Sequence, residues 1–331
     1  MKARIALIYG GASSEHDVSV KGYEYVTELL KNSDYEILPV YIDETGEWHL
    51  RIKGADTPAF PTGNMGGSLY TGCGFIKIDA AIPLLHGEGG EDGSVQGTLE
   101  IMGIPYVGAG VSASALCIDK IYAKTAADAL GIPTLKSVSF SRATDTEIAL
   151  AECQKKLGFP LFIKPRRLGS SVGAYPIRDE AEFRYAFPRA MREGKNLVMA
   201  ERMLTSKREL ECAFCEIRGE EIITSPGEIL IDGFYGYDEK YGGHTRTTAI
   251  ADIPDTIKKR IAEYSHALSD ALNLRHLARI DYFLSDGELY FNEINTFPGF
   301  TRESLYPKML EANGIEPAHA LISFIEDALG C

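Results

Sequence analysis

The N-terminal segment constrains the fold more than any other part of the sequence. Residues 4–9 form an apolar run that ends at Gly10 and Gly11. Such a run is typical of a strand buried on both faces of a parallel sheet, and the two glycines allow a tight turn after it. A pair of serines follows and can cap a helix over residues 15–31. The segment therefore predicts a strand, a turn and a helix in that order.

Two further strands extend this pattern. They are predicted at residues 35–42 and 78–85, while residues 43–75 are rich in turn formers and carry little secondary-structure signal. Strands that alternate with helices favour a doubly wound parallel sheet, which binds ligands at the carboxyl ends of its strands. We expect this α/β domain to cover residues 1–118 and a second unit to begin near Asp119.

The second unit is predicted from its own apolar patterns. Strands are expected at residues 161–165, 196–201, 209–217, 278–284 and 288–294, and helices at residues 119–131, 256–272 and 315–329. Residues 226–247 form a long polar segment rich in Tyr and Gly. A loop of that length in a compact protein is usually a functional lid or a disordered stretch.

Composition excludes several classes of protein. The chain has 331 residues, 45% of them hydrophobic, and a formal net charge of −13. A globular protein with two domains or more is expected, and an acidic surface disfavours partners such as nucleic acid or an anionic membrane. No apolar run approaches the ~20 residues that span a bilayer. The six cysteines are too sparse for a disulfide framework, so a cytoplasmic protein is expected.

The sharpest chemical signal lies in the predicted hairpin near the C-terminus. If residues 285–287 form a three-residue loop, Asp281 faces Phe291. Because side chains alternate along a strand, Asp281, Glu293 and Asn295 then project from one face. Two carboxylates and an amide oxygen suit Mg²⁺. The alternative is a solvated face, and a one-residue slip in register would turn Asp281 away.

Two cationic side chains accompany this candidate metal site. Arg279 shares the face of Asp281 and suits a carboxylate or a developing oxyanion, although a salt bridge to Asp281 or Glu293 is the simpler interpretation. Lys164 ends an apolar strand, and the Gly/Ser loop at residues 169–173 follows. Such a loop offers backbone N–H groups to a phosphate, but the pattern is no Walker A motif and also fits an ordinary turn.

Other patterns are weaker. Residues 108–113 fit the dinucleotide fingerprint, but its acidic partner would be Asp128, which lies in a predicted helix rather than at a strand end. Cys212 and Cys215 lie on a predicted strand with their side chains on opposite faces, which disfavours zinc or redox pairing. His86 lies at the carboxyl end of a predicted strand, which favours a role in a site. Glu15 opens a predicted helix, where it is either an acid that is favourable to the helix dipole or a residue that orients a substrate ammonium.

Together, these residues resemble the D-alanine–D-alanine ligases of the ATP-grasp superfamily. The most specific motifs are HG-x-x-GEDG-x-x-QG at residues 86–97 and E-x-N-x-x-PG at residues 293–299. Further matching positions are Asp119-Lys120, Lys164-Pro165 with GSSVG, Lys240-Tyr241, residues 279–281 and Ser304. The resemblance runs from about residue 4 to residue 310 in the family's order.

The resemblance implies a two-lobed ATP-grasp fold after the N-terminal domain. The central lobe would cover residues 119–205 and the C-terminal lobe residues 206–331, with ATP between them. Residues 226–247 resemble the family's ω-loop, which closes over the site.

The resemblance also implies roles for single residues. ATP would be held by Lys120, Lys164, Ser171, Glu201, Leu204, Glu209, Lys240 and Asn292, and two Mg²⁺ or Mn²⁺ ions by Asp281, Glu293 and Asn295. Catalysis would involve Glu15, Ser170, Tyr241, Arg279 and the backbone N–H of Gly299. The D-alanine substrates would contact His86, Ser304 and Leu305.

The implied reaction joins two D-alanines through an acyl phosphate at the expense of ATP, for peptidoglycan precursor synthesis. Leu305 and the intact Lys240-Tyr241 pair favour D-alanine as the second substrate. Arg302 and Glu303 depart from the Ser-His of many relatives and bring extra charge near the acceptor subsite. The family also suggests a homodimer. Alternatives are a D-Ala–D-Ser or other D-Ala–D-X ligase, a non-catalytic ATP-binding module, and an NAD-dependent enzyme that uses residues 108–113.

Overall fold

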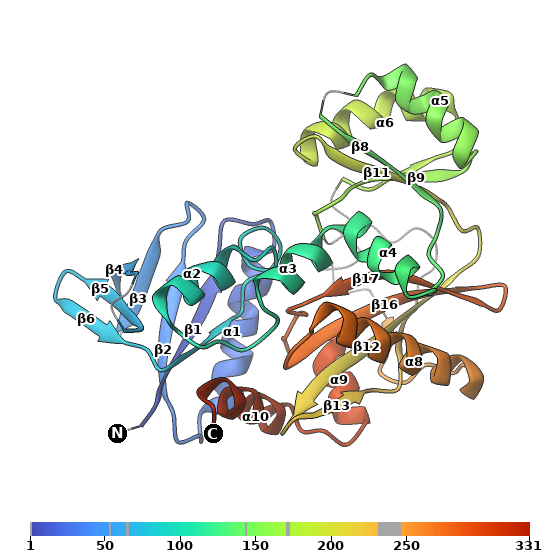
Figure 1. The fold of residues 1–331 in the computed structure, drawn as a ribbon. Helices are drawn as coiled ribbons and strands as arrows, with labels where there is room; N and C mark the ends of the chain where they lie inside the picture. The colour runs from blue at the N-terminus through green and yellow to red at the C-terminus, as the bar shows by residue number, and fades with distance from the viewer. Residues whose placement is uncertain (1, 53, 64–65, 143, 170–172, 231–245) are drawn as a thin grey trace.

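The computed structural model describes residues 2–52, 54–63, 66–142, 144–169, 173–230 and 246–331. Within them the chain forms a seven-stranded, a four-stranded and a six-stranded sheet, each flanked by helices. The strands and helices predicted above are confirmed to within two residues at each end. Figure 1 shows the four-stranded sheet in a lobe that stands away from the other two sheets.

The N-terminal sheet is mixed rather than doubly wound. Its strands are β1 (Arg4–Gly10), β2 (Glu36–Ile42), β3 (Trp48–Ile52), β4 (Ala55–Pro61), β5 (Ser68–Thr71), β6 (Gly74–Lys77) and β7 (Ala80–Pro83). Their order is β6-β5-β4-β3-β2-β1-β7. Only the pairs β1–β2 and β1–β7 are parallel, and β2 to β6 pair antiparallel in sequence order.

The expectation of a purely parallel sheet was wrong because residues 43–75 are not a loop. They hold most of β3 to β6, joined by short turns. A parallel pair needs a crossover long enough for a helix, and such turns permit only antiparallel neighbours. The parallel pair β1–β2 does have a helical crossover, because α1 (His16–Leu30) connects these two strands.

The two ends of the chain share one hydrophobic core. Core side chains of β1 and β7 belong to the same buried cluster as those of α9 (Leu305–Ala312) and α10 (Pro317–Leu329). The helix α10 contacts α1, β7 and the six-stranded sheet. The N-terminal sheet is therefore attached to the C-terminal part through a buried apolar contact, while the domain boundaries at residues 118 and 205 stay predictions.

The four-stranded sheet forms the separate lobe. Its strands are β8 (Ser137–Ser141), β9 (Leu161–Pro165), β10 (Tyr175–Ile177) and β11 (Leu197–Arg202), in the antiparallel order β10-β9-β11-β8. The helices α5 (Thr146–Lys156) and α6 (Glu180–Glu193) bury their apolar faces against this sheet. This lobe presents β9 and β11, with Lys164 and Glu201, toward the rest of the molecule.

The six-stranded sheet provides the opposite side. Its strands are β12 (Arg208–Ile217), β13 (Glu220–Ile223), β14 (Gly227–Leu230), β15 (Arg246–Thr248), β16 (Leu277–Ser285) and β17 (Glu288–Asn295), all antiparallel. One face packs against α4 (Lys120–Ala129) and α8 (Asp255–Leu272). The predicted loop at 226–247 thus contains β14 and the start of β15, and its residues 231–245 lie outside the described residues.

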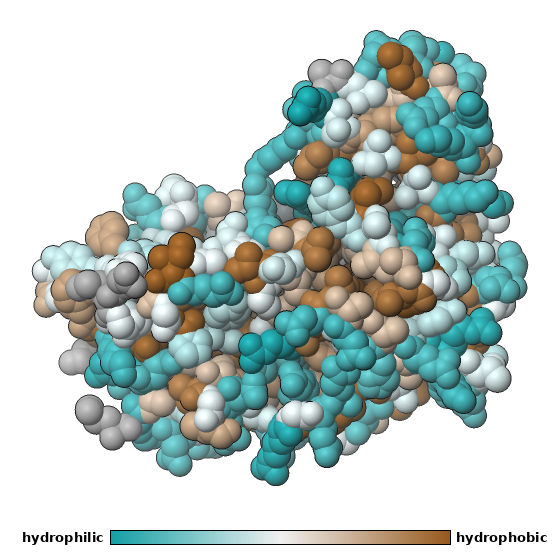
Figure 2. All heavy atoms as spheres, viewed as in Figure 1, coloured by the Kyte–Doolittle hydropathy of each residue, from teal (hydrophilic) through white to brown (hydrophobic). Residues whose placement is uncertain are grey.

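Helices between the sheets carry exposed apolar side chains. Ile101 lies on α2 (Ser94–Met102), Leu116 on α3 (Val111–Ile118) and Tyr122 on α4, and all three are exposed. Figure 2 shows apolar side chains gathered over this region. The homodimer stays a prediction. Among the described residues, no helix is both long and apolar enough for a transmembrane span.

All six cysteines are free thiols in the structure. Cys212 belongs to the core between the six-stranded sheet and α8, whereas Cys215 belongs to the core shared with α9 and α10. Their side chains therefore lie on opposite faces of β12, as predicted, and cannot bind one metal ion.

Candidate active site

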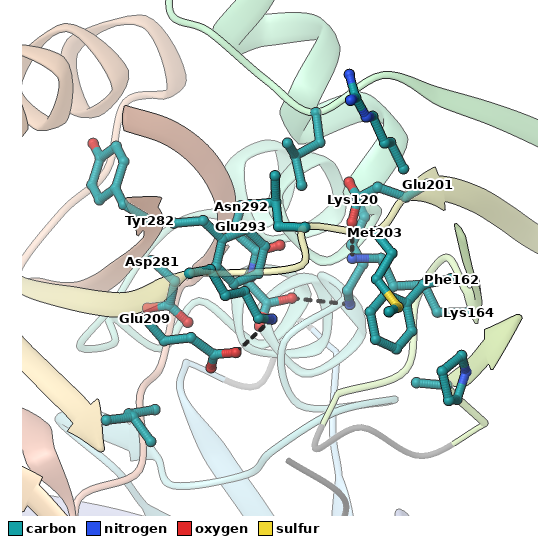
Figure 3. A pocket seen from close by; sticks show the side chains of 18 of the residues that line it. Lys120, Phe162, Lys164, Glu201, Met203, Glu209, Asp281, Tyr282, Asn292 and Glu293 are labelled. Carbon is teal, nitrogen blue, oxygen red and sulfur yellow. Dashed lines mark hydrogen bonds and ion pairs between the residues drawn. The ribbon is translucent and has the colours of Figure 1, made fainter. Parts of the chain in front are cut away.

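A cavity of about 510 Å³ lies between the four-stranded and six-stranded sheets (Figure 3). Its lining includes nine residues that the sequence singled out: Lys120, Lys164, Glu201, Leu204, Glu209, Arg279, Asp281, Asn292 and Glu293. They come from α4, β9, β11, β12, β16 and β17 and from the segment after β11. The fold thus brings together residues that are far apart in the sequence.

One wall of the cavity is a buried cluster of two lysines and one glutamate. Lys164 Nζ lies 2.8 Å from Glu201 Oε2, and Lys124 Nζ contacts Glu201 Oε1. Burial alone would raise the pKa of Glu201, but the charges of Lys124 and Lys164 hold it at about 2. The cluster carries one excess positive charge, which suits a phosphate group.

Lys124 was missed by the sequence analysis. It lies on α4 and its side chain is 4% exposed. The available signal was its spacing, because residues four apart on a helix share a face and Lys120 was already a candidate.

Lys120 connects the two walls. Its Nζ donates to the carbonyl of Leu168 at 2.9 Å and lies 3.1 Å from Glu293 Oε2. The preceding residue, Asp119, is fully buried and caps α4 by accepting from the backbone N–H of Ile121. Arg166 binds Asp119 through two nitrogens, at 2.9 and 2.8 Å, which fixes the start of α4 and therefore Lys120.

The second wall contains Arg279 between two carboxylates. Arg279 binds both oxygens of Asp281, at 2.8 and 2.6 Å, and its Nε lies 3.1 Å from Glu211 Oε2. Burial would lower the pKa of Arg279, but the two carboxylates raise it well above the ordinary value. The salt bridge between Arg279 and Asp281, which was the simpler interpretation of the sequence, is therefore present. Glu211, which is 4% exposed, was not predicted.

The turn of the hairpin differs from the predicted one. Ser285 pairs with Glu288, so the loop has two residues, Asp286 and Gly287, rather than residues 285–287. Both have positive φ, 51° and 80°. This is the geometry of a type I′ turn, for which Asp-Gly is a preferred sequence.

A β-bulge then corrects the register. Tyr282 pairs with Phe291 and Asp281 with Glu293, which leaves Asn292 without a partner residue on β16. The predicted pairing of Asp281 with Phe291 is therefore wrong. The extra residue nevertheless places the carboxylates of Asp281 and Glu293 on neighbouring positions of two adjacent strands.

The chemistry of this corner fits a divalent cation beside a nucleotide. Asp281, Glu293 and Asn295 supply oxygen ligands of the kind that Mg²⁺ and Mn²⁺ prefer, and Asn295 Nδ2 lies 3.3 Å from Asp281 Oδ2. Asn292 Oδ1 is buried at the cavity without a hydrogen-bond partner among the described residues. A buried acceptor of this kind is costly unless a ligand or water satisfies it. Glu209 also lines the cavity, and its Oε1 lies 2.7 Å from Lys207 Nζ.

Two of the predicted substrate residues, Glu15 and His86, lie near the Gly87 and Phe297 loops. A Cβ built on Gly87 would lie 2.9 Å from Glu15 Oε2, and one on Gly169 would lie 3.4 Å away, so the Glu15 carboxylate lies between these two loops. Burial lowers the pKa of His86, and its Nδ1 donates to the carbonyl of Phe297 at 3.2 Å. His86 is therefore neutral at pH 7. Neither Glu15 nor His86 lines the 510 Å³ cavity.

Glu91 is a further carboxylate in this region, inside the predicted HG motif but without a predicted role. Its Oε2 accepts from the backbone N–H of Gly87 at 2.8 Å. Burial and the nearby Glu15 raise the pKa of Glu91 to about 8. This region therefore contains a carboxyl group that is protonated at pH 7.

The predicted acceptor residues lie at the start of α9. Ser304 Oγ accepts from the Thr301 N–H at 3.1 Å, and a Cβ on Gly299 would lie 3.0 Å from it. Leu305 is buried against Gly227 of β14. Gly299, Ser304 and Leu305 do not line the cavity.

The charge of Arg302 points away from this region. Its guanidinium is exposed and lies 2.7 Å from Glu28 on α1. Ser170, Ser171, Lys240 and Tyr241 lie outside the described residues, so their predicted roles stay predictions.

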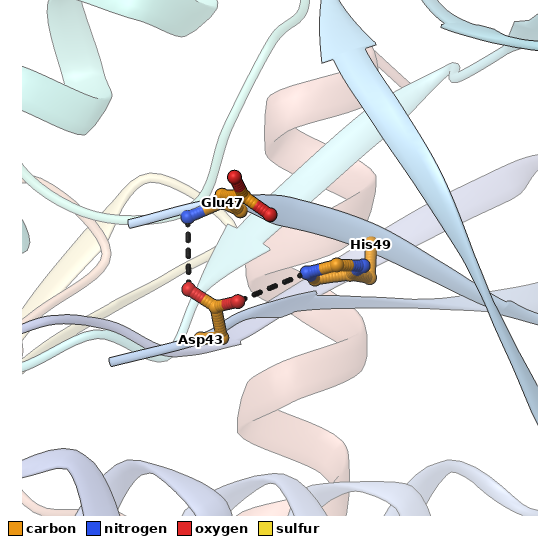
Figure 4. Close-up of side chains that lie close together, drawn as sticks. All are labelled: Asp43, Glu47 and His49. Carbon is orange, nitrogen blue, oxygen red and sulfur yellow. Dashed lines mark hydrogen bonds and ion pairs between the residues drawn. The ribbon is translucent and has the colours of Figure 1, made fainter. Parts of the chain in front are cut away.

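Two other patterns remain apart from the cavity. The N–H of Gly108 donates to His276 Nδ1, and Asp128 lies in α4, so residues 108–113 do not follow the dinucleotide-binding pattern. Asp43, Glu47 and His49 lie close together at the β2–β3 turn (Figure 4). Asp43 Oδ1 accepts from the Glu47 N–H and Oδ2 lies 3.2 Å from His49 Nε2, so the group is explained by its own hydrogen bonds.

Comparisons with known proteins cover nearly the whole chain. The family described as "D-ala D-ala ligase N-terminus" matches residues 4–109, and "D-ala D-ala ligase C-terminus" matches residues 127–326. The "D-alanine--D-alanine ligase A" of Chromobacterium violaceum is 36% identical over 99% of this chain and 95% of its own length. The "D-alanine--D-alanine ligase" of Solibacter usitatus is 38% identical over 99% and 96%.

Two solved structures have the same fold. "D-alanyl-alanine synthetase A" from Vibrio cholerae has a TM-score of 0.91 at 34% identity and covers 100% of this chain and 99% of its own. The "VanG D-Ala:D-Ser Ligase" from Enterococcus faecalis has a TM-score of 0.89, also at 34% identity, and covers 99% and 100%. The similar proteins therefore include ligases with two different named products.

Proposed function

Because the chain belongs to the D-alanine–D-alanine ligase family, we propose that it joins two D-alanine molecules to D-alanyl-D-alanine at the expense of ATP, in the cytoplasm, for peptidoglycan precursor synthesis. The observation that carries the proposal is the cavity, which holds the cations Lys120 and Lys164 opposite the carboxylates Asp281 and Glu293. A polyphosphate with a divalent cation needs both kinds of group.

In this proposal the cavity binds ATP. Lys120 and Lys164 contact phosphate oxygens, and Glu201, Leu204, Glu209 and Asn292 surround the nucleoside. Asp281, Glu293 and Asn295 would hold Mg²⁺ or Mn²⁺, which when bound neutralises charge on the phosphates during transfer. The γ-phosphoryl group passes to the carboxylate of the first D-alanine, which gives an acyl phosphate and ADP.

The second half of the reaction is assigned to the region beside Arg279. Glu15 orients the ammonium group of the first D-alanine. The amine of the second attacks the acyl carbon, phosphate leaves, and a proton is released from the amine. Arg279 and the backbone N–H of Gly299 stabilise the oxyanion of the tetrahedral intermediate. Residues 226–247, with Lys240 and Tyr241, are proposed to cover the site against hydrolysis.

D-Alanine is proposed as the second substrate on the basis of two contacts. Leu305 is buried and apolar, which suits a methyl group, and Arg302 is neutralised by Glu28 rather than directed at Ser304. The second candidate is a D-Ala–D-Ser ligase, which the similarity to the Enterococcus faecalis enzyme favours.

The test is phosphate release from Mg²⁺-ATP with D-alanine alone and then with added D-serine or D-lactate, followed by mass analysis of the products. We expect phosphate release that requires D-alanine, with D-alanyl-D-alanine as the product. A mixed product in the presence of D-serine would support the second candidate. ATP binding without turnover would instead support a non-catalytic module.

A further inference from the structure

We propose that Glu211 is a positioning residue that holds the Arg279 guanidinium when Asp281 binds a divalent cation. The inference rests on the proposed function and extends it to a residue outside the predicted metal and oxyanion groups. Glu211 lies on β12, is buried, and lines the cavity beside Arg279 and Asp281.

Both oxygens of Asp281 are bound by Arg279. The two oxygens of Asp281 lie 2.8 and 2.6 Å from two nitrogens of the guanidinium. This is a bidentate pair, the strongest arrangement of these two groups. Asn295 Nδ2 adds a third donor at 3.3 Å.

A divalent cation on Asp281 competes with this pair. A cation on Asp281 needs at least one of the oxygens that Arg279 occupies, and it also repels the guanidinium. The side chain of Arg279 is 13% exposed, so water cannot replace a lost counter-ion. Leaving a buried guanidinium without a partner is strongly unfavourable.

Glu211 offers Arg279 a second carboxylate when a cation binds Asp281. It is the register partner of Asp281 on the adjacent strand, so the two carboxylates flank Arg279 from neighbouring positions of one sheet. Its Oε2 already lies 3.1 Å from Arg279 Nε. A small shift of the guanidinium toward Glu211 frees an oxygen of Asp281 while Arg279 stays paired and close to the reaction site.

The test measures Mn²⁺ binding in the presence of ADP, by the loss of the free Mn²⁺ signal in electron paramagnetic resonance. We expect Glu211→Gln to weaken Mn²⁺ binding about tenfold, because Arg279 then depends more strongly on Asp281 for its counter-charge. Glu211→Asp keeps the charge and should recover most of the affinity, which also provides a folded variant if Gln is not tolerated.

A control separates this effect from the loss of an arginine–carboxylate pair elsewhere in the protein. Asp56 on β4 is bound by two nitrogens of Arg51, at 2.7 and 2.9 Å, and does not line the cavity. Asp56→Asn should leave the Mn²⁺ affinity within about twofold of the unmodified protein.

A double-mutant cycle decides whether Glu211 acts through Arg279. In an Arg279→Met background, Asp281 has no guanidinium to release, so Glu211→Gln should weaken Mn²⁺ binding by no more than about threefold, the effect of one lost nearby charge. A tenfold loss that persists in this background would mean that Glu211 binds the cation itself, and the inference would be wrong. Unchanged Mn²⁺ binding in Glu211→Gln would overturn it as well.

Activity measurements keep this inference separate from the proposed function. If the unmodified protein forms no dipeptide, the proposed function fails, while the Mn²⁺ titrations still decide the role of Glu211. If it does form dipeptide, Glu211→Gln should raise the Mg²⁺ concentration needed for half-maximal rate about tenfold and lower kcat, with little change in the KM for ATP at saturating Mg²⁺.

Discussion

Each wall of the cavity contains one buried charged group between two groups of the opposite charge, and the signs are reversed between the two walls. On one wall the buried carboxylate Glu201 lies between Lys124 and Lys164, and on the other the buried guanidinium of Arg279 lies between Glu211 and Asp281. The first group has one excess positive charge and the second one excess negative charge. In the proposed function, each wall therefore suits a different part of one ligand, with the phosphates on one side and a divalent cation on the other.

The two lysines beside Glu201 also differ from each other in exposure. Lys124 has a side chain that is 4% exposed, whereas that of Lys164 is 15% exposed and lines the cavity. When Lys164 contacts a phosphate, Lys124 remains as the counter-ion of Glu201. Glu211 has the corresponding role for Arg279 in our proposal.

The largest expected effect is a loss of turnover when the carboxylate that lies between the two walls is replaced. Glu293 pairs with Lys120 and is a proposed cation ligand. Glu293→Gln should lower the turnover about 10³-fold, because phosphoryl transfer then loses a charged metal ligand, while the melting temperature changes little. Glu288→Gln, an exposed position on the same strand, is the control and should keep near-native turnover. Near-native activity in Glu293→Gln would contradict the metal assignment.

The next effect tests whether Lys124 is a fixed counter-ion. Lys124→Met leaves Glu201 with Lys164 alone and should reduce the free energy of unfolding by about 3 kcal/mol, the usual cost of breaking a buried pair. The apparent KM for ATP should also rise, because Lys164 is then needed by Glu201. Urea denaturation and steady-state kinetics measure the two quantities. A loss below about 0.5 kcal/mol, typical of a surface position, would refute the comparison between the walls.

A smaller effect contrasts Glu201 with Glu91, a carboxyl group for which the nearby Arg279 does not offset the effects of burial and of the Glu15 charge. The pKa of Glu91 is raised from 4.5 to about 8. A raised pKa in the folded state means that the contribution to stability is complete below pH 4.5 and is lost as the pH rises through 8. Glu91→Gln cannot ionise, so its stability relative to that of the unmodified protein should increase as the pH rises from 4.5 to 8. Thermal unfolding at several pH values measures this difference.

If the stability difference between Glu91→Gln and the unmodified protein does not change with pH, the protonated state of Glu91 is excluded. The pKa of Glu201 is shifted in the opposite direction, to about 2, so its contribution is present above pH 4.5 and is lost as the pH falls toward 2. The two carboxylates should therefore affect opposite ends of the pH range.

Charged residues inside apolar strands could be predicted from the sequence, but their partners could not. Lys164, Asp281 and Glu293 stand out because charges are rare in buried strands. Lys124 shares a helix face with Lys120, and Glu211 is a charge on a buried strand, so both could have been candidates. Their partners, Glu201 and Arg279, are known only from the tertiary contacts.

Details of the backbone were a second part of the structure that was hard to predict from the sequence. The Asp286-Gly287 pair could have indicated a two-residue turn, since this dipeptide favours type I′. The bulge at Asn292 could not be predicted, because it depends on the packing of both strands. In the N-terminal sheet, alternation in residues 43–75 is too weak to distinguish short antiparallel strands from loops, so the mixed sheet was missed.

The smallest expected effect concerns Arg302, whose charge first raised doubt about the second substrate. Its exposed pair with Glu28 should contribute less than about 1 kcal/mol to stability, because solvent screens it. Arg302→Ala should therefore change the ratio of D-alanine to D-serine incorporation by less than about twofold, as judged by mass analysis of the products in competition. Leu305→Arg places a charge at a buried position beside Gly227 and is the contrasting variant, with a large shift in that ratio or loss of activity. A strong shift of this ratio in Arg302→Ala would mean that the charge of Arg302 reaches the acceptor when the substrate is bound. The pair with Glu28 would then not explain why Arg302 leaves the selection of the second substrate unaffected.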